Sequence, residues 1–185
     1  MKTFRTLMGG LLMVGTMTIA GCVPAPVRIP EIPLSKVEPY FSEAAVVEAI
    51  DTAFYQVKDA QGTLLGTVLL SEPFSESVMG YNGKTPLLIA LDAEGRIKNV
   101  VLLDNSETPR FAQRVANGGL YQAWDGLTVE EALAKTVDAV SGATYTSNGV
   151  KNSLAVRLEA YQRQLTKDYS ANKPGFWQKL FAPKR

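Results

Sequence analysis

Residues 86–103 read PLLIALDAEGRIKNVVLL, and this stretch decides which fold the rest of the chain must fit. Two strand-like apolar runs, Pro86–Leu91 and Arg96–Leu103, flank the four residues Asp92-Ala93-Glu94-Gly95. A short turn with glycine where a positive φ is needed joins two neighbouring strands into a hairpin. The stretch therefore predicts an antiparallel sheet at the centre of the fold.

The residues upstream of this hairpin predict a helix and a further hairpin. Ala53–Val57 and Leu64–Leu70 are strand-like runs separated by Asp59-Ala60-Gln61-Gly62, which has the composition of a turn. Before them, Ser42–Ile50 begins with a capping residue and continues with alanine and glutamate, so we expect a capped first helix there.

Three helical stretches follow the sheet. Pro109–Asn117 predicts a short helix that ends at Gly118-Gly119, and Thr128 has capping-box spacing for a second helix that reaches about Ala134. The third runs from Ser147 to about Gln164. Its apolar stripe is expected to face the sheet: Val150, Leu154, Leu158, Tyr161 and Leu165. Its basic residues are expected to stay in solvent: Lys151, Arg157 and Arg163.

Strands followed by helices predict an α+β domain. We expect an antiparallel sheet of two hairpins, packed by the long C-terminal helix and by short helices. The folded unit is placed at residues 41–165, about 125 residues, which is enough for one hydrophobic core.

The N-terminus has the pattern of a secretion signal over residues 1–21. Lys2 and Arg5 precede an apolar run of about fourteen residues, whereas a bilayer-spanning helix needs about twenty. Ile19-Ala20-Gly21-Cys22 resembles the lipobox of bacterial lipoproteins, so we expect a diacylated Cys22 as the first residue of the mature chain. The predicted location is the extracytoplasmic side of the cell envelope, lipid-anchored to a membrane. A retained signal anchor with a buried Cys22 is the alternative.

Two further segments flank the predicted domain. Residues 22–40 are rich in proline and predict a semi-extended tether of about 3.1 Å per residue. Because Val27, Ile29 and Ile32 are apolar, packing along the domain remains an equal alternative. Residues 166–185 form a basic and aromatic tail, which either lies on a membrane or partner or folds back over an apolar groove of the domain.

Composition restricts the chemistry of the chain. It has one cysteine and no histidine, which argues against disulfides, cysteine-rich zinc sites, iron–sulfur clusters, histidine-ligated haem and a Ser-His-Asp triad. No metal site is expected, and any redox work must come from an organic cofactor. Without Lys2 and Arg5 the 19 basic residues fall by two, against 18 acidic ones, so the net charge is near −1. A nucleic-acid partner is therefore not expected.

The stretch Asp138–Ser147 carries the chemistry. It is a hydroxyl-rich turn with a glycine that runs into the predicted long helix. Unpaired N–H groups and the helix dipole favour a phosphate at such a start, and Gly142 lets the backbone approach closely. The hydroxyls expected to donate to it belong to Ser141, Thr144, Thr146 and Ser147. The alternative is an ordinary turn and helix cap.

The same residues resemble the flavinylation signature of the FMN-binding domain family, Asp-x-x-Ser/Thr-Gly-Ala-Thr. The resemblance aligns Asp138, Ser141, Gly142 and Ala143 with this signature and makes Thr144 the residue that carries FMN through a phosphoester bond. Since the chain has no histidine to serve as a base for Thr144, attachment needs another enzyme. The resemblance implies that this enzyme is a magnesium-dependent flavin transferase that uses FAD. Asp138 either helps a metal ion during transfer or caps the turn.

Two other segments resemble this family. Gly80-Tyr81-Asn82-Gly83-Lys84 is similar to the start of its central hairpin, and Glu107-Thr108-Pro109 is similar to its Glu-Thr-Pro element. The resemblance implies that Gly80 and Tyr81 belong to the cofactor site and that Glu107, Thr108 and Pro109 lie near the isoalloxazine. Ordinary turn and helix-start roles remain compatible with this. Arg110 departs from the glycine of the pump subunits in this family, and it either faces solvent or neutralises reduced flavin.

Three classes of function remain, and the first is preferred. The chain is expected to be a membrane-tethered electron-transfer flavoprotein, rather than an enzyme with its own substrate, with a membrane or envelope redox partner. The second class is a noncovalent flavin- or ligand-binding lipoprotein without redox turnover. The third is a structural envelope lipoprotein, which has no need for the stretch from Asp138 to Ser147.

Overall fold

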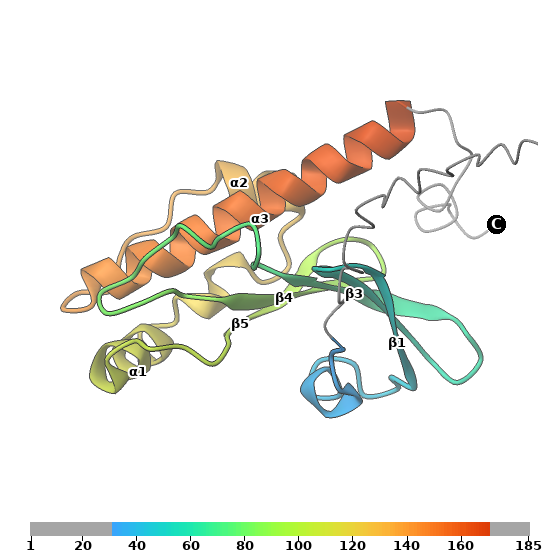
Figure 1. Ribbon diagram of the computed structural model, residues 1–185, viewed down its shortest axis with the longest axis horizontal. Coiled ribbons are helices and arrows are strands. Elements are labelled where there is room, and N and C mark those ends of the chain that lie inside the picture. Colours follow the sequence, from blue (N-terminus) through green and yellow to red (C-terminus); the bar gives the residue numbers. More distant parts are fainter. Residues whose placement is uncertain (1–30, 171–185) are drawn as a thin grey trace, which may run out of the picture.

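The computed structural model describes residues 31–170. The predicted secretion signal, the lipidation site Cys22 and the first part of the tether lie outside these residues, as does the tail from residue 171 onward. The elements run in this order: η1 Leu34–Lys36, β1 Val46–Asp51, β2 Phe54–Lys58, β3 Leu64–Leu70, β4 Leu87–Asp92, β5 Ile97–Leu102, α1 Pro109–Asn117, η2 Tyr121–Trp124, α2 Val129–Ala134 and α3 Thr144–Ser170 (Figure 1).

The strands form one antiparallel sheet in the order β1-β2-β3-β4-β5, so each strand pairs with its neighbours in sequence. The two predicted hairpins are confirmed as β2–β3 and β4–β5. Gly62 and Gly95 have φ values of +82° and +81° in their turns, a region that glycine enters without steric cost. The expected α+β class, with a sheet packed by a long C-terminal helix and short helices, is confirmed.

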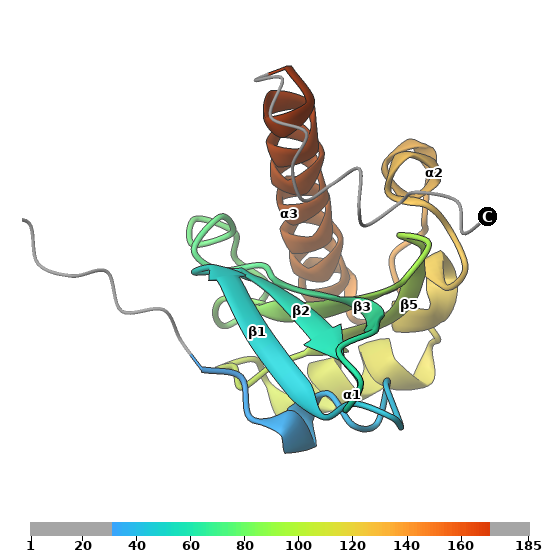
Figure 2. The same cartoon turned by 90° about the vertical axis from the view of Figure 1, so that its right-hand side faces the viewer.

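Two apolar layers cover the sheet, one on each face. On one face, Ile89 and Leu91 pack in a core with Leu154 and Leu158 of α3. On the other face, alternate residues such as Leu88 pack with the N-terminal segment that includes η1. Figures 1 and 2 show α3 and η1 on opposite sides of the sheet. Because both faces of β4 are covered, this strand is a continuous apolar run rather than an alternating one.

The N-terminal segment packs on the domain where the structure describes it. Val37 and Phe41 are buried, and Ile32 and Leu34 pack against the same cluster. Of the two interpretations left open for residues 22–40, packing along the domain therefore applies to residues 32–40.

The predicted first helix at Ser42–Ile50 is wrong, because Val46–Asp51 forms the edge strand β1. Val46 pairs with Lys58 and Val47 with Val57, so the backbone groups of β2 find partners on this side. The alanines and glutamates favour a helix locally, but β-branched residues suit a strand and the unpaired edge of β2 decides the outcome.

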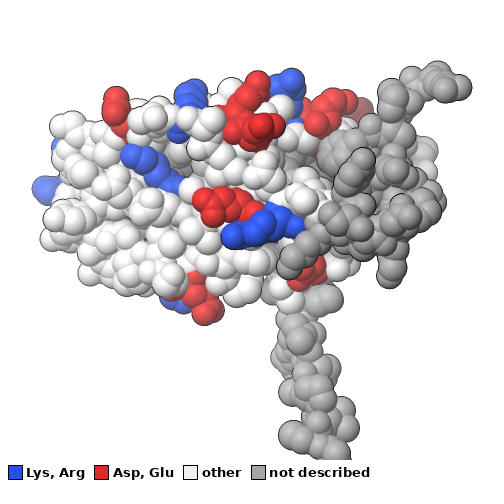
Figure 3. Space-filling model, turned by 90° about the horizontal axis from the view of Figure 1, so that it is seen from above, with Lys and Arg blue, Asp and Glu red and all other residues white. Residues whose placement is uncertain are grey.

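The short helices α1 and α2 have the predicted bounds, and Thr128 and Glu131 form the predicted capping box. The helix α3 begins at Thr144, three residues earlier than predicted, and ends later, at Ser170. None of the helices within residues 31–170 combines the length and the apolar character that crossing a membrane requires. Figure 3 shows acidic and basic side chains interspersed on one face of the molecule.

One residue of α3 contradicts its predicted exposure. Lys151 is half-buried and Arg163 is exposed, but Arg157 is 0% exposed. Its Nη2 donates a hydrogen bond of 3.0 Å to the carbonyl of Ala53, and its guanidinium lies 4.8 Å from the ring centroid of Phe74. Burial lowers the pKa of Arg157 to about 10. Arg157 was expected in solvent because helical periodicity does not show that the loop containing Phe74 folds over this side of α3.

Candidate functional site

The predicted acceptor loop is a tight turn that ends at the start of α3. The N–H of Ala143 donates to the carbonyl of Val140 at 3.0 Å, and Gly142 has a φ of +74° inside this turn. The Oγ of Ser147 accepts from the N–H of Val140 at 3.1 Å and donates to the carbonyl of Ala143 at 2.9 Å. Ser147 therefore fixes the loop to the first turn of α3.

Thr144 is the first residue of α3 and is exposed. The first i→i−4 bond at this end joins the N–H of Ser147 to the carbonyl of Ala143 at 2.9 Å. The N–H groups of Thr144, Tyr145 and Thr146 precede that bond, as in any helix start, and they carry the positive end of the helix dipole. The Thr144 hydroxyl is thus presented in a region that favours an anion.

The hydroxyls expected to face an anion divide into two pairs. Ser141 and Thr144 are exposed, whereas Thr146 and Ser147 are fully buried. The buried pair donates within the protein: Ser147 to Ala143, and Thr146 to Oε2 of Glu107 at 2.5 Å. Only the exposed pair is therefore placed to meet a phosphate from solvent.

Glu107 joins three segments of the predicted site. Its Oε1 accepts from the N–H groups of Asn82 at 2.9 Å and Gly83 at 3.1 Å, while Oε2 accepts from Thr146. The side chain is 5% exposed, and a Cβ added at Gly80 would lie 2.5 Å from its Oε1. The predicted residues Gly80 and Glu107 thus meet because Gly80 lacks a side chain.

A cavity of about 190 Å³ opens beside Thr144. It is lined by residues 142–146 of the acceptor loop and α3, by Tyr81, and by Phe111 of α1. The rings of Tyr81 and Phe111 meet edge to face at 4.7 Å, and Tyr81 lies 6.4 Å from Tyr145. Tyr81 and Tyr145 are 58% and 71% exposed, and with Phe111 they form a contiguous aromatic patch, which marks a candidate binding site. The cavity is therefore suited to a flat aromatic group.

Three lining or neighbouring residues escaped the sequence analysis: Phe111, Arg114 and Tyr145. Phe111 and Arg114 lie on α1, and the guanidinium of Arg114 packs so closely on Gly142 that a Cβ there would overlap its Nη1. Phe111 and Tyr145 lie next to or close to motif residues in the sequence, and this proximity could have identified them as candidates for the site. No sequence signal places Arg114 beside Gly142.

The other predicted residues lie outside the lining of this cavity. Asp138 is exposed, and its carboxylate has no hydrogen bond or ion pair within residues 31–170, so the turn-cap alternative is not seen. Thr108 occupies the N-cap position of α1 without a side-chain cap bond, and Pro109 is the first helical residue. Arg110 is exposed, with its guanidinium 5.1 Å from the ring centroid of Phe111.

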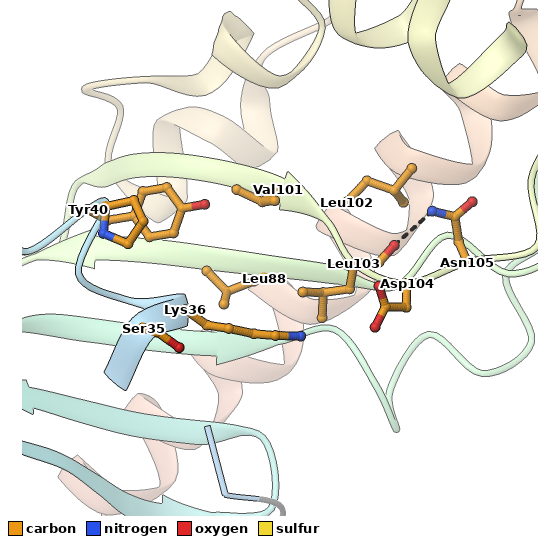
Figure 4. A pocket seen from close by; sticks show the side chains of 10 residues that line it. Ser35, Lys36, Tyr40, Leu88, Val101, Leu102, Leu103, Asp104 and Asn105 are labelled. Atoms are coloured by element: carbon orange, nitrogen blue, oxygen red, sulfur yellow. Dashed lines mark hydrogen bonds between the residues drawn. The ribbon is translucent and has the colours of Figure 1, made fainter. Parts of the chain in front are cut away.

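Two larger hollows lie near β5. One, of about 630 Å³, lies between the N-terminal segment and the sheet, and Figure 4 shows Lys36, Tyr40 and Leu88 along it. None of the predicted cofactor residues lines it. The other, of about 640 Å³, includes Glu107 and Tyr121. Burial, and then the charge of Glu107, raise the pKa of Tyr121 to about 12.

The segment that contains this site is similar to known proteins. Residues 80–159 match the model of the FMN-binding domain family. The chain is 34% identical to a subunit of the ion-translocating oxidoreductase complex of Stutzerimonas stutzeri over 109 residues, covering 53% of this chain and 48% of that protein. It is 23% identical to a subunit of the Na⁺-translocating ferredoxin:NAD⁺ oxidoreductase complex of Acetobacterium woodii over 141 residues, covering 71% of this chain and 66% of that protein.

Among solved structures, the crystal structure of Shewanella oneidensis NqrC is 22% identical, with a TM-score of 0.45, and the match covers 62% of this chain and 60% of that one. The chain thus spans between about half and two thirds of the length of these relatives. The matched family segment contains the acceptor loop, Thr144, Glu107 and the aromatic cavity. Residues 80–159, which hold this site, are therefore similar to the FMN-binding domain family.

Proposed function

We propose that this protein is an electron-transfer flavoprotein that carries FMN covalently on Thr144. The observation that supports this most is the position of Thr144, exposed at the first residue of α3 and on the wall of the aromatic cavity. A phosphate linked to its hydroxyl would meet the N–H groups at the helix start, and the attached ring would lie against Tyr81, Phe111 or Tyr145.

FMN would supply redox chemistry that the side chains of this chain lack. The chain has no histidine, and its single cysteine is Cys22. The protein's own contribution is to hold the phosphate at the helix start and to keep the loops of the site together through Glu107. Because the chain has no histidine to act as a base for the Thr144 hydroxyl, we favour attachment by a separate transferase.

Attachment would consume FAD. The Thr144 oxygen attacks the phosphorus on the FMN side, the phosphoanhydride bond breaks, a phosphoester forms, AMP leaves, and the hydroxyl proton passes to a base of the transferase. The exposed carboxylate of Asp138, six residues before Thr144, is available to hold the magnesium ion that accompanies FAD.

The membrane assignments belong to the same proposal. Two relatives are named as subunits of ion-translocating oxidoreductase complexes, which supports a membrane redox partner for this chain. The sequence around Cys22 supports a lipid anchor on the extracytoplasmic side. Replacing Cys22 with alanine should abolish the acyl mass and detergent partitioning of the exported protein. Wild-type protein that is exported without an acyl group would refute the anchor and leave the flavin assignment standing.

The central test replaces Thr144 with alanine. After co-expression with a flavin transferase, wild-type protein should show flavin fluorescence that persists on the denatured band, with a peptide mass that locates the adduct on Thr144. The Thr144→Ala variant should show none, while its free energy of unfolding changes by less than about 0.5 kcal/mol, because one exposed hydroxyl is lost.

Ser141→Ala is the matched control, since Ser141 is the other exposed hydroxyl of the loop and should retain covalent flavin. Thr146→Ala is a poorer control because it also removes a donor from Glu107. Wild-type protein that binds FMN but releases all of it on denaturation would favour the second function, a noncovalent flavin-binding lipoprotein.

A further inference from the structure

We infer that Arg114 recognises the flavin phosphate at Thr144, an inference that rests on the proposed FMN site. Arg114 lies in the last turn of α1, and its guanidinium covers the backbone of Gly142, two residues before Thr144. A Cβ at Gly142 would overlap Nη1 of Arg114 and lie 3.3 Å from its Cζ. Glycine at position 142 therefore allows both the positive φ of the turn and the close packing of this guanidinium.

Arg114 is exposed and has no direct partner for its charge among the residues that the structure describes. It forms none of the ion pairs and none of the side-chain hydrogen bonds found within residues 31–170. Arg110, one turn earlier on the same helix, rests on the ring of Phe111 instead. A guanidinium offers five N–H donors in a planar fork that matches two phosphate oxygens.

Two positive features therefore converge on the acceptor loop. The start of α3 supplies N–H groups and the dipole, and α1 supplies Arg114, which packs against Gly142. A phosphoester between Thr144 and FMN keeps one negative charge, which this arrangement would balance. The competing explanation is that Arg114 only stabilises the C-terminal end of α1, where a cation is favourable in any helix.

A binding comparison between FMN and riboflavin separates these explanations, because the two ligands differ only in the phosphate. The measurement uses the full chain with Thr144→Ala, so that no flavin becomes covalent, and follows the quenching of flavin fluorescence. FMN should bind more tightly than riboflavin. Arg114→Met should reduce that preference by about tenfold, since a hydrogen-bonded charge pair is lost. The affinity for riboflavin should not change.

Arg110→Met is the matched control because it removes the same charge from the same helix, and it should keep the preference for FMN. Arg114→Lys keeps the charge without the fork and should give an intermediate preference. Equal preferences in the Arg114→Met and Arg110→Met proteins would overturn the inference, as would a Thr144→Ala protein that does not distinguish the two ligands.

The outcome is separable from that of the covalent proposal. Wild-type protein that never acquires covalent flavin, although Arg114→Met lowers the preference for FMN, would refute the attachment and support the phosphate contact. Covalent labelling of the wild type together with an unchanged preference for FMN in Arg114→Met would support the attachment and refute the phosphate contact.

Discussion

Two charged side chains are buried along α3, and their surroundings differ. Near the start of the helix, both carboxylate oxygens of Glu107 accept hydrogen bonds from three donors. In the middle of the helix, Arg157 makes one hydrogen bond, to Ala53, while its Nε and Nη1 have no hydrogen-bond partner within residues 31–170. Aromatic rings, including that of Phe74, cover much of its guanidinium.

The difference indicates that these two regions along α3 are stabilised in different ways. At the start of α3, the Glu107 carboxylate accepts from Asn82, Gly83 and Thr146, so removing this one acceptor affects several segments at once. The middle of α3 depends on apolar burial, where a charge is tolerated rather than required. Substitution by an apolar residue of similar length should therefore destabilise the domain much more at Glu107 than at Arg157.

The largest effect is expected for Glu107→Met. It leaves the N–H groups of Asn82 and Gly83 and the hydroxyl of Thr146 buried without an acceptor, at about 1–3 kcal/mol each. The free energy of unfolding, measured with urea, should fall by about 3 kcal/mol or more. Glu107→Gln retains one carbonyl oxygen and should lose about 1 kcal/mol. A loss below about 1 kcal/mol for Glu107→Met would show that the loops are held in another way.

An intermediate effect is expected from alkaline pH through Tyr121. Its pKa is raised to about 12, by burial first and by Glu107 second. Below pH 10 the phenol is protonated in both states, so this group adds no pH dependence. Between pH 10 and pH 12 only the unfolded state releases the proton, and stability falls by up to about 1.4 kcal/mol per pH unit.

Tyr121→Phe removes this contribution, so urea unfolding of the variant should depend less steeply on pH in that window. In the Glu107→Gln background, where the neighbouring charge is absent, the difference between tyrosine and phenylalanine should shrink. An identical pH dependence in wild type and Tyr121→Phe would mean that Tyr121 titrates alike in the folded and unfolded states.

The smallest effect is expected for Arg157→Met. The substitution loses the bond to Ala53 and the contact with Phe74, but it also removes a charge whose burial is unfavourable, as the lowered pKa shows. These contributions oppose each other, and the free energy of unfolding should change by less than about 1 kcal/mol in urea unfolding. Arg163→Met, at an exposed position of the same helix, is the control. A loss above about 3 kcal/mol for Arg157→Met would make the charge essential.

Local signals in the sequence were sufficient for much of the fold. The turns at Gly62 and Gly95 and the bounds of α1 depend on neighbouring residues, and their prediction from the sequence is confirmed. The strand β1 and the burial of Arg157 depend on residues distant in sequence, the edge of β2 and the loop of Phe74. The hydrophobic periodicity of one element cannot predict either feature, because it describes only the faces of that element and not what packs against them.

The candidate site shows the same limit. The motifs brought Gly80, Tyr81, Glu107 and Thr144 to attention, and the structure places them around the start of α3. It also buries the Thr146 hydroxyl against Glu107, a contact across 39 residues of sequence. The proximity of Glu107 to the isoalloxazine remains a prediction from family resemblance.

The burial of Thr146 and Ser147 has a consequence for site selectivity. The first turn of α3 carries three aliphatic hydroxyls, at Thr144, Thr146 and Ser147, and the folded domain leaves only that of Thr144 exposed. A modifying enzyme that meets the folded protein finds a single reachable aliphatic hydroxyl in this turn and has no need to distinguish Thr144 from Thr146 or Ser147. If FMN is attached as proposed, the choice among these three hydroxyls is set by the tertiary structure of the acceptor, and an unfolded chain would be expected to lose this selectivity.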